Sequence, residues 1–283
     1  MHHLRHHLSL YFLIALFSMA FLVWYISFEL QADNNLLTVA FLDVGQGDAM
    51  LIDTPGDKQI LIDGGSNKKV LSELGKMMPF YDRSIDVVIA THADADHIGG
   101  LPDVLARYDV EYIFDSDSSS DTGVFDAWQE AIQKENATYT HISRGTRIFL
   151  DENIWLDVIY PFKGQKTEDA NDMSVVAKLI YGDTCFLLTG DLERTGEFKL
   201  LKDDLECDVL KVGHHGSKTS TSDAFLQAVS PAIAVISAGK ENKYGHPHEV
   251  VMNKLQNAGI SFLRTDDGGM IVLFSDGEKV WRE

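Results

Sequence analysis

The chain changes pattern near residue 36, and beyond that point short apolar runs alternate with polar turn residues. Runs of strand length bounded by Gly, Pro, Asp or Asn predict β-strands at residues 37–43, 48–53, 59–63 and 85–90. Apolar residues at three- and four-residue spacing predict helices at residues 66–78, 101–108 and 124–135. Further strands are predicted at residues 154–160, 174–182 and 185–190, after which helix and strand alternate to the end.

This order of elements predicts an α/β fold. Beyond residue 36 the chain begins with consecutive strands, continues with alternating strands and helices, and then repeats this order. Such a repeat indicates two sheets covered by helices. In such layered folds functional residues collect on loops at strand ends. Every polar cluster described below follows a predicted strand.

The first 30 residues form a separate apolar segment. From Leu8 to Phe28 no side chain is charged, and as a helix this stretch would extend roughly 30 Å, the thickness of a bilayer's hydrocarbon core. It is longer than the apolar part of a usual signal peptide and no convincing cleavage site follows it, so we expect an uncleaved single-pass anchor. Arg5 precedes it, and the positive-inside rule then leaves the amino terminus in the cytoplasm and the rest outside. Cleavage would instead give a secreted protein.

The predicted organisation is an anchor over residues 1–30, a polar linker over residues 31–36 and one domain over residues 37–283. The two cysteines, Cys185 and Cys207, are too few for a disulfide framework. Each lies in an apolar run, which favours buried free thiols, with one disulfide as the alternative.

The charge balance is strongly acidic, with 43 Asp and Glu against 24 Lys and Arg and a formal net charge of −19. Such a surface repels nucleic acid overall. A DNA substrate therefore requires a local basic patch or bound metal, and acidity that only maintains solubility is the simpler interpretation.

The segment "THADADHIGG", residues 91–100, follows a predicted strand and holds four candidate metal ligands, His92, Asp94, Asp96 and His97. Imidazole nitrogens and carboxylate oxygens at this spacing can converge from a tight loop onto two neighbouring metal ions. The two glycines at its end allow a close approach of the backbone. An acidic turn formed by chance is the alternative.

Single aspartates end several other predicted strands. Asp191 ends "FLLTGD", and its two oxygens can bridge two metal ions. Asp43 and Asp48 lie in "FLDVGQGDAMLID", and Asp63 ends "ILID". These three could be turn residues, or their carboxylates could hold ligand histidines in the required tautomer.

The loop in "DVLKVGHHGSKTS", residues 208–220, supplies His214, His215, Ser217 and Lys218 after another strand. One imidazole can bind metal while its neighbour contacts substrate or moves a proton. Lys211 and Lys218 would add the positive charge that the overall composition lacks. Two solvent-exposed histidines are the alternative.

The segment "NKYGHPHEVV", residues 242–251, places His246 and His248 before a helix that starts near Glu249. His248 would lie at the amino end of that helix, where an anionic group is favoured. A helix cap with incidental histidines remains open.

Six motifs in order, "DVGQGDAMLI", "LIDGG", "THADADHIGG", "LLTGDLE", "LKVGHHGSKTS" and "YGHPH", resemble the metallo-β-lactamase superfamily of dinuclear hydrolases. They are most similar to the hydrolase domain at the carboxyl end of ComEC-type competence (DNA-uptake) proteins, over residues 37–275. The resemblance implies a four-layered αββα sandwich behind a single transmembrane helix, with two divalent metal ions at one edge of the sheets.

The resemblance also implies a role for each matching residue. The first metal would take His92 and Asp94, the second Asp96 and His97, with Asp191 bridging and His215 preferred to His214 as the last ligand. The implied catalytic residues are Asp96, Asp191, His214, Lys218 and His248. Ser217 and His246 would contact substrate, although the pair His246 and His248 leaves open which one ligates metal. The residues that would position ligands are Asp43, Asp48, Asp63 and Asn171.

Two departures from the family pattern matter. A further ligand histidine is usual between the first motif and the bridging aspartate, but "DANDMSVV" offers Asn171 and Asp172, so we expect the first metal to be weakly held. Competence proteins also have many membrane-spanning helices, whereas one anchor is predicted here, so we do not expect this chain to carry DNA across a membrane.

The expected function is metal-dependent hydrolysis of a phosphodiester, with DNA as the first substrate to test. The expected cofactors are two divalent ions, Mn²⁺ in preference to Zn²⁺, because Asp94 replaces an imidazole with a harder oxygen ligand. The alternatives are a non-catalytic metal-binding subunit of a DNA-uptake or surface apparatus and a hydrolase of small esters or lactones. No protein partner is predicted.

Overall fold

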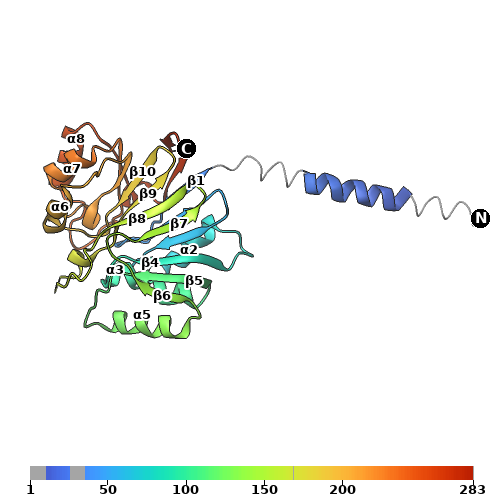
Figure 1. Cartoon of the computed structure of the whole chain (residues 1–283), viewed down its shortest axis with the longest axis horizontal. Coiled ribbons are helices and arrows are strands. Elements are labelled where there is room, and N and C mark those ends of the chain that lie inside the picture. Colours follow the sequence, from blue (N-terminus) through green and yellow to red (C-terminus); the bar gives the residue numbers. More distant parts are fainter. Residues whose placement is uncertain (1–10, 26–35, 168, 283) are drawn as a thin grey trace, which may run out of the picture. The chain divides into compact units, whose positions relative to one another are not determined.

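The computed structural model describes residues 11–25, 36–167 and 169–282. The chain divides into two units, Met1–Leu36 and Leu37–Glu283. In the first unit residues 11–25 form a helix (Figure 1). The side chains of these residues are exposed. Among the described residues no helix is both long and apolar enough to cross a membrane, so the predicted transmembrane helix is not supported. Residues 1–10 and 26–30 of the predicted anchor, and residues 31–35 of the predicted linker, lie outside the described residues.

The second unit contains two facing sheets. The eight-stranded sheet has the order β15 (Val280–Trp281), β14 (Ile271–Ser275), β1 (Leu37–Phe41), β2 (Met50–Asp53), β3 (Gln59–Ile62), β4 (Ser84–Ala90), β5 (Asp109–Asp115) and β6 (Thr138–His141). The seven-stranded sheet has the order β13 (Ser261–Arg264), β12 (Ile233–Ile236), β11 (Val209–Lys211), β10 (Thr184–Leu188), β9 (Val176–Tyr181), β8 (Ile154–Tyr160) and β7 (Arg147–Asp151).

Both sheets carry apolar residues on their two faces, because side chains alternate along each strand. Val39 and Phe41 of β1 belong to the core between the sheets, whereas Ala40 belongs to the core under the helices. The strands therefore read as continuous apolar runs, as expected where both faces are covered. These continuous apolar runs explain why the strands could be predicted from the sequence.

Helices cover the outer face of each sheet (Figure 1). The first sheet is packed by α2 (Lys69–Met77), α3 (Ala95–Ile98), α4 (Leu101–Leu105) and α5 (Gly123–Lys134). The second is packed by α6 (Arg194–Leu200), α7 (Asp223–Val229) and α8 (Glu249–Asn257). Short helical turns η1 (Asn171–Met173), η2 (Gly213–Gly216) and α9 (Thr265–Gly268) lie in connecting loops. The prediction of two sheets covered by helices is confirmed.

The parallel strands set the position of the functional loops. The run β3–β6 is parallel in one sheet and β10–β13 in the other. Carboxyl ends of parallel strands meet at one edge of a sheet, where ligands bind in open α/β sheets.

Cys185 and Cys207 form a disulfide. The interpretation of these cysteines as free thiols was wrong, and the alternative of one disulfide holds. The bond joins β10 to the segment that enters β11, two neighbouring parallel strands. Neighbours in a sheet can bring two side chains together although 22 residues separate them along the chain.

A cluster of carboxylates at the end of the β2–β3 hairpin generates a stability prediction. Burial, followed by the charges of Asp57, Asp82 and Asp86, raises the pKa of Asp53 to about 6. The folded state thus binds this proton more tightly than the unfolded state does. The resulting contribution to stability is present below the usual pKa near 4 and is lost as the pH rises through 6.

We expect Asp53→Asn to raise the melting temperature at pH 7.5 by roughly 2–4 °C, about 1 kcal/mol after allowing for partial exposure. It should also flatten the dependence of stability on pH between 4 and 6. Thermal unfolding followed by circular dichroism checks both, with the exposed Asp183→Asn as control. Equal effects of the two substitutions would contradict the assignment to Asp53.

Candidate metal centre

The centre is formed by loops from both sheets. Asp63 follows β3, and the loop 91–97 follows β4 in the first sheet. Asp191 follows β10, and His215 follows β11 in the second sheet. Four side chains that could hold a metal ion, Asp48, His97, Asp191 and His215, have candidate ligand atoms within 4.8 Å of one another.

Close backbone packing brings the loops together. At Gly47, where φ is +117°, a Cβ would lie 1.9 Å from the carbonyl oxygen of Asp96. At Gly100 it would lie 2.1 Å from the carbonyl oxygen of Gly64. Only glycine can occupy such positions, so the glycines of two of the motifs are required for assembly of the centre.

Asp191 lies at the middle of the cluster. Its Oδ1 is 3.3 Å from His97 Nε2, and its Oδ2 is 3.2 Å from His215 Nε2. His214 Nε2 lies further away, 3.8 Å from Oδ2. The carboxylate thus faces imidazoles from both sheets, and its predicted role as a bridge between two metal ions stays a prediction.

The remaining predicted ligands surround this core. Asp96 Oδ2 is 3.3 Å from His215 Nε2, and the rings of His92 and His97 are 4.1 Å apart. Asp94 is more exposed, with its Oδ2 3.8 Å from His92 Nε2. The structure therefore brings all six predicted metal ligands to one place.

Hydrogen bonds fix the orientation of the histidines from the first sheet. His97 Nδ1 donates to Asp63 Oδ2 at 2.8 Å, and Asp63 also accepts from the backbone nitrogen and hydroxyl of Thr91. His92 Nδ1 lies 3.0 Å from Thr91 Oγ1. Both rings therefore turn Nε2 toward Asp191 and its neighbours.

His215 is held in the same way from the second sheet. Its Nδ1 donates to the carbonyl oxygen of Ser237 at 3.0 Å, which requires the proton on Nδ1 and leaves the lone pair of a neutral ring on Nε2. The Nε2 atoms of His92, His97 and His215 are buried without a hydrogen bond. Buried polar atoms rarely lack partners, and imidazoles held at Nδ1 with a free Nε2 are typical of metal ligands. The residues present fit a divalent metal.

The charged groups of the cluster indicate that a metal cation would replace protons on the histidines. Burial opposes a positive charge on His97 and His215, but nearby carboxylates raise the pKa of both histidines well above the usual value. These carboxylates are Asp191 and Asp63 for His97, and Asp191 and Asp48 for His215. Burial also opposes ionisation of Asp191, yet the two histidines hold its pKa well below the usual range. Without metal the carboxylates are balanced by protons on imidazole. Metal binding would release those protons.

Asp48 has a different environment from the other carboxylates. Its Oδ2 is 2.5 Å from the Nζ of Lys211, which is fully buried, and its Oδ1 is 3.2 Å from His215 Nδ1. Both oxygens lie within ion-pair distance of these groups but neither has a hydrogen bond, so the predicted role of Asp48 in orienting His215 stays a prediction. Lys211 was expected to offer positive charge to substrate, and its burial against Asp48 shows that expectation to be wrong.

His214 forms a second, more exposed group with Glu193. Its Nδ1 is 3.1 Å from Glu193 Oε1, which also accepts from Thr219 Oγ1 at 2.8 Å. The backbones of His214 and His215 are both left-handed, with φ of 49° and 53°. Such conformations cost about 1–3 kcal/mol each and cluster at functional sites. This turn directs the two adjacent imidazoles to the same side of the chain. Glu193 was not predicted, although its place two residues after Asp191 was a usable signal.

The loop before α8 completes the rim of the centre. The ring of His246 lies 5.5 Å from that of His214 and 4.9 Å from that of His248. His248 Nδ1 accepts the backbone N–H of Lys218 at 3.1 Å, so a neutral His248 carries its proton on Nε2. That tautomer suits donation to a substrate oxygen rather than metal ligation.

Four other predicted residues contribute less directly. Asp43 pairs with Lys69 at 2.9 Å and accepts from the backbone of Gly45, so its described contacts do not reach a ligand histidine. The hydroxyl of Ser217 contacts Thr219, and Lys218 is exposed. The backbone N–H of Asn171 donates to Asp169 Oδ1, whereas Asn171 Oδ1 is buried without a hydrogen bond.

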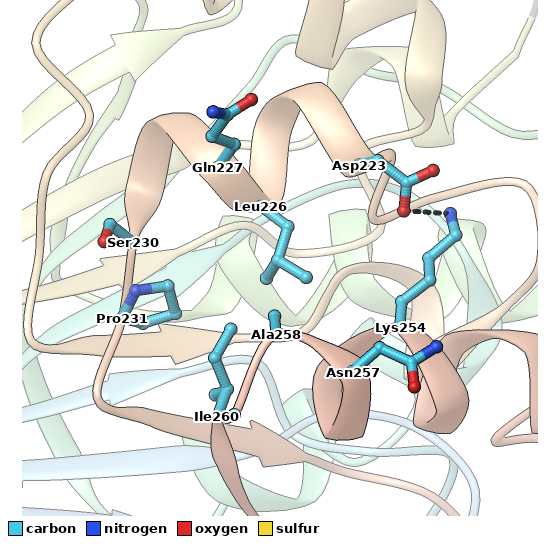
Figure 2. A pocket seen from close by; sticks show the side chains of 10 residues that line it. Asp223, Leu226, Gln227, Ser230, Pro231, Lys254, Asn257, Ala258 and Ile260 are labelled. Atoms are coloured by element: carbon cyan, nitrogen blue, oxygen red, sulfur yellow. Dashed lines mark ion pairs between the residues drawn. The ribbon is translucent and has the colours of Figure 1, made fainter.

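A cavity lies away from the metal centre, on the second sheet's helices. It has a volume of about 520 Å³ between α7 and α8, is lined by Leu226, Pro231 and Ile260, and is bordered by the ion pair of Asp223 and Lys254 (Figure 2). It contains none of the predicted site residues. Its size alone therefore does not identify the functional site.

The chain resembles proteins of one family. The family model for the metallo-beta-lactamase superfamily matches residues 42–240. The chain is 34% identical over 252 residues to ComE operon protein 3 of Bacillus subtilis (strain 168), covering 82% of this chain and 32% of that protein. It is 31% identical over 261 residues to competence protein ComA of Neisseria gonorrhoeae, covering 88% of this chain and 34% of that protein. The chain spans about a third of the length of these relatives.

Solved structures support the fold. YhfI, a metallo-beta-lactamase fold protein from Bacillus subtilis, superimposes with a TM-score of 0.56 at 12% identity, covering 87% of this chain and 99% of that one. CmlA, a diiron β-hydroxylase from Streptomyces venezuelae, gives a TM-score of 0.55 at 12% identity, covering 87% and 54%. The resemblance inferred from the motifs is confirmed.

The hydrogen bonds of Asp63 predict its effect on metal affinity. Asp63→Asn should weaken metal binding by roughly 10–100-fold, because the amide no longer holds His97 with a charged acceptor. Competition with a fluorescent chelator measures this for Mn²⁺ and Zn²⁺. Asp115→Asn is a matched control, since Asp115 is also buried against a histidine, His141, outside the cluster. Equal losses in the two variants would contradict the assigned role.

Proposed function

The chain belongs to the metallo-β-lactamase superfamily, and on this basis we propose that it is a metal-dependent phosphodiesterase whose substrate is DNA. The observation that carries the proposal is the group of three buried imidazoles whose Nε2 atoms lack hydrogen bonds and whose Nδ1 atoms are held. His92, His97 and His215 would hold the metal together with the three carboxylates Asp94, Asp96 and Asp191.

Divalent metal at this position supplies a Lewis acid and lowers the pKa of water, which favours attack on an ester near neutral pH. Asp96 and Asp191 are placed to accept the proton that the attacking water loses. Harder oxygen ligands such as Asp94 favour Mn²⁺ over Zn²⁺ in the proposal.

In the proposal His214 and Glu193 protonate the leaving group. Glu193 accepts from Nδ1–H of His214, so this histidine can deliver a proton only as the imidazolium, whose second N–H is on Nε2, near Asp191. Nε2–H of His248 and the ammonium of Lys218 can donate to non-bridging oxygens. These donors suit an anionic phosphodiester better than a neutral ester or lactone.

The relatives support DNA as the substrate class, since two are named as competence or ComE operon proteins and another, from Haemophilus influenzae, as recombination protein 2. In the proposal residues 37–283 form the hydrolase domain.

Hydrolysis assays test the proposal directly. The metal-loaded chain should hydrolyse methyl 4-nitrophenyl phosphate and DNA with Mn²⁺, and Asp191→Ala should lower kcat/KM by about 100-fold or more. Asp203→Ala, which breaks only an exposed pair with Arg144, serves as control. Activity on lactones or phosphocholine esters alone, or full activity of Asp191→Ala, would refute it.

The contact of Glu193 with His214 predicts a dependence on the leaving group. Glu193→Gln should lower kcat by about 100-fold for DNA, whose alkoxide leaving group needs a proton. It should lower kcat only a few-fold for methyl 4-nitrophenyl phosphate, whose leaving group is stable as an anion. Steady-state kinetics on both substrates checks this. Equal losses would show that Glu193 acts through structure alone.

A further inference from the structure

Tyr244 is an exposed aromatic residue beside the metal centre. Its side chain is 51% exposed, and its ring stacks on that of His246, with centroids 5.6 Å apart and planes inclined by 21°. His246 in turn lies 6.1 Å from the ring of His215. A continuous set of rings therefore runs from the ligand histidines to solvent.

The loop that carries Tyr244 is braced in this arrangement. Asn242 Oδ1 accepts the backbone N–H groups of Tyr244 and His246 at 3.1 and 3.0 Å. Asn242 Nδ2 donates to the carbonyl oxygen of Gly239 at 2.8 Å, which ties the loop to the end of β12. The exposed ring is thus held in place rather than free to pack elsewhere, so little ordering entropy is lost when a ligand contacts it.

Three exposed lysines lie on the loop of Tyr244 and on the loop that precedes α7, on an otherwise acidic protein. The ammonium of Lys243 lies 5.0 Å from the centroid of the Tyr244 ring. Lys240 is exposed on the same loop, and exposed Lys218 is joined through its backbone to His248. Among the described residues these three lysines form no ion pair within 4.0 Å, so their charge is available to a phosphate backbone.

We propose that Tyr244 is a stacking platform for the nucleobase next to the scissile phosphate, so that the site takes single-stranded nucleic acid. This inference rests on the proposed phosphodiesterase function. A half-exposed aromatic ring, with the Lys243 ammonium over it and one ring away from the ligand histidines, matches a base attached to a bound phosphate. In a duplex the same base is already stacked and paired and does not offer its face, so the platform discriminates against duplex DNA.

Binding without hydrolysis tests the platform. Fluorescence anisotropy in EDTA, with the full-length chain, would compare a labelled thymidine hexanucleotide with an abasic strand of the same phosphate number. Tyr244→Ala should weaken binding of the thymidine strand about tenfold and leave binding of the abasic strand unchanged. Tyr244→Phe keeps the ring and should bind within about twofold of the wild type. Phe149→Ala, an exposed aromatic residue on β7, is the control for loss of an exposed ring.

The outcomes separate the platform from the proposed function. Equal losses on the thymidine and abasic strands, no loss with Tyr244→Ala, or tighter binding of a duplex of equal length would each overturn the platform. Failure of the wild type to hydrolyse methyl 4-nitrophenyl phosphate with any divalent metal would overturn the phosphodiesterase function alone. A base-dependent loss with Tyr244→Ala would then still support single-strand binding.

Discussion

The buried carboxylate of Asp63 is the contact on which the geometry of the centre depends. It accepts three hydrogen bonds, from the backbone nitrogen and hydroxyl of Thr91 and from His97 Nδ1. These bonds tie the end of β3 to the loop after β4, and they fix the direction in which His97 presents Nε2. A carboxylate with no water access is tolerated only when it is satisfied in this way. The ligand loop is therefore held before any metal arrives.

A second buried contact relates the two sheets. Asp48 precedes β2 in the first sheet, Lys211 belongs to β11 in the second, and the two form an ion pair with no exposed surface. A buried pair of this kind adds little net stability compared with apolar residues, but loss of one partner leaves a costly unpaired charge. This ion pair holds the two sheets in a fixed relative position. Asp48 also contacts His215. One carboxylate thus contacts both the opposite sheet and a histidine of the metal centre.

The sequence pattern allowed prediction of most elements and of the loops that meet at the centre, because strands buried on both faces are continuous apolar runs and glycines mark the tight turns. It did not reveal contacts that depend on pairing across the sheets. The burial of Lys211 follows from the strand that faces it, and the disulfide of Cys185 and Cys207 follows from the adjacency of β10 and β11. Edge strand β7 also escaped prediction, because its exposed Phe149 and charged ends obscure the apolar run.

The position of β1 has a consequence for biosynthesis. This strand, the first of the sandwich to be made, lies between β2 and β14, and β14 comes from residues 271–275 near the end of the chain. Until those residues have been synthesised, one edge of an apolar strand, LTVAF, has no partner. Unpaired apolar edges recruit other chains. While residues 42–270 are being synthesised, this strand edge must therefore be protected from intermolecular pairing, by chaperones or by rapid synthesis of those residues.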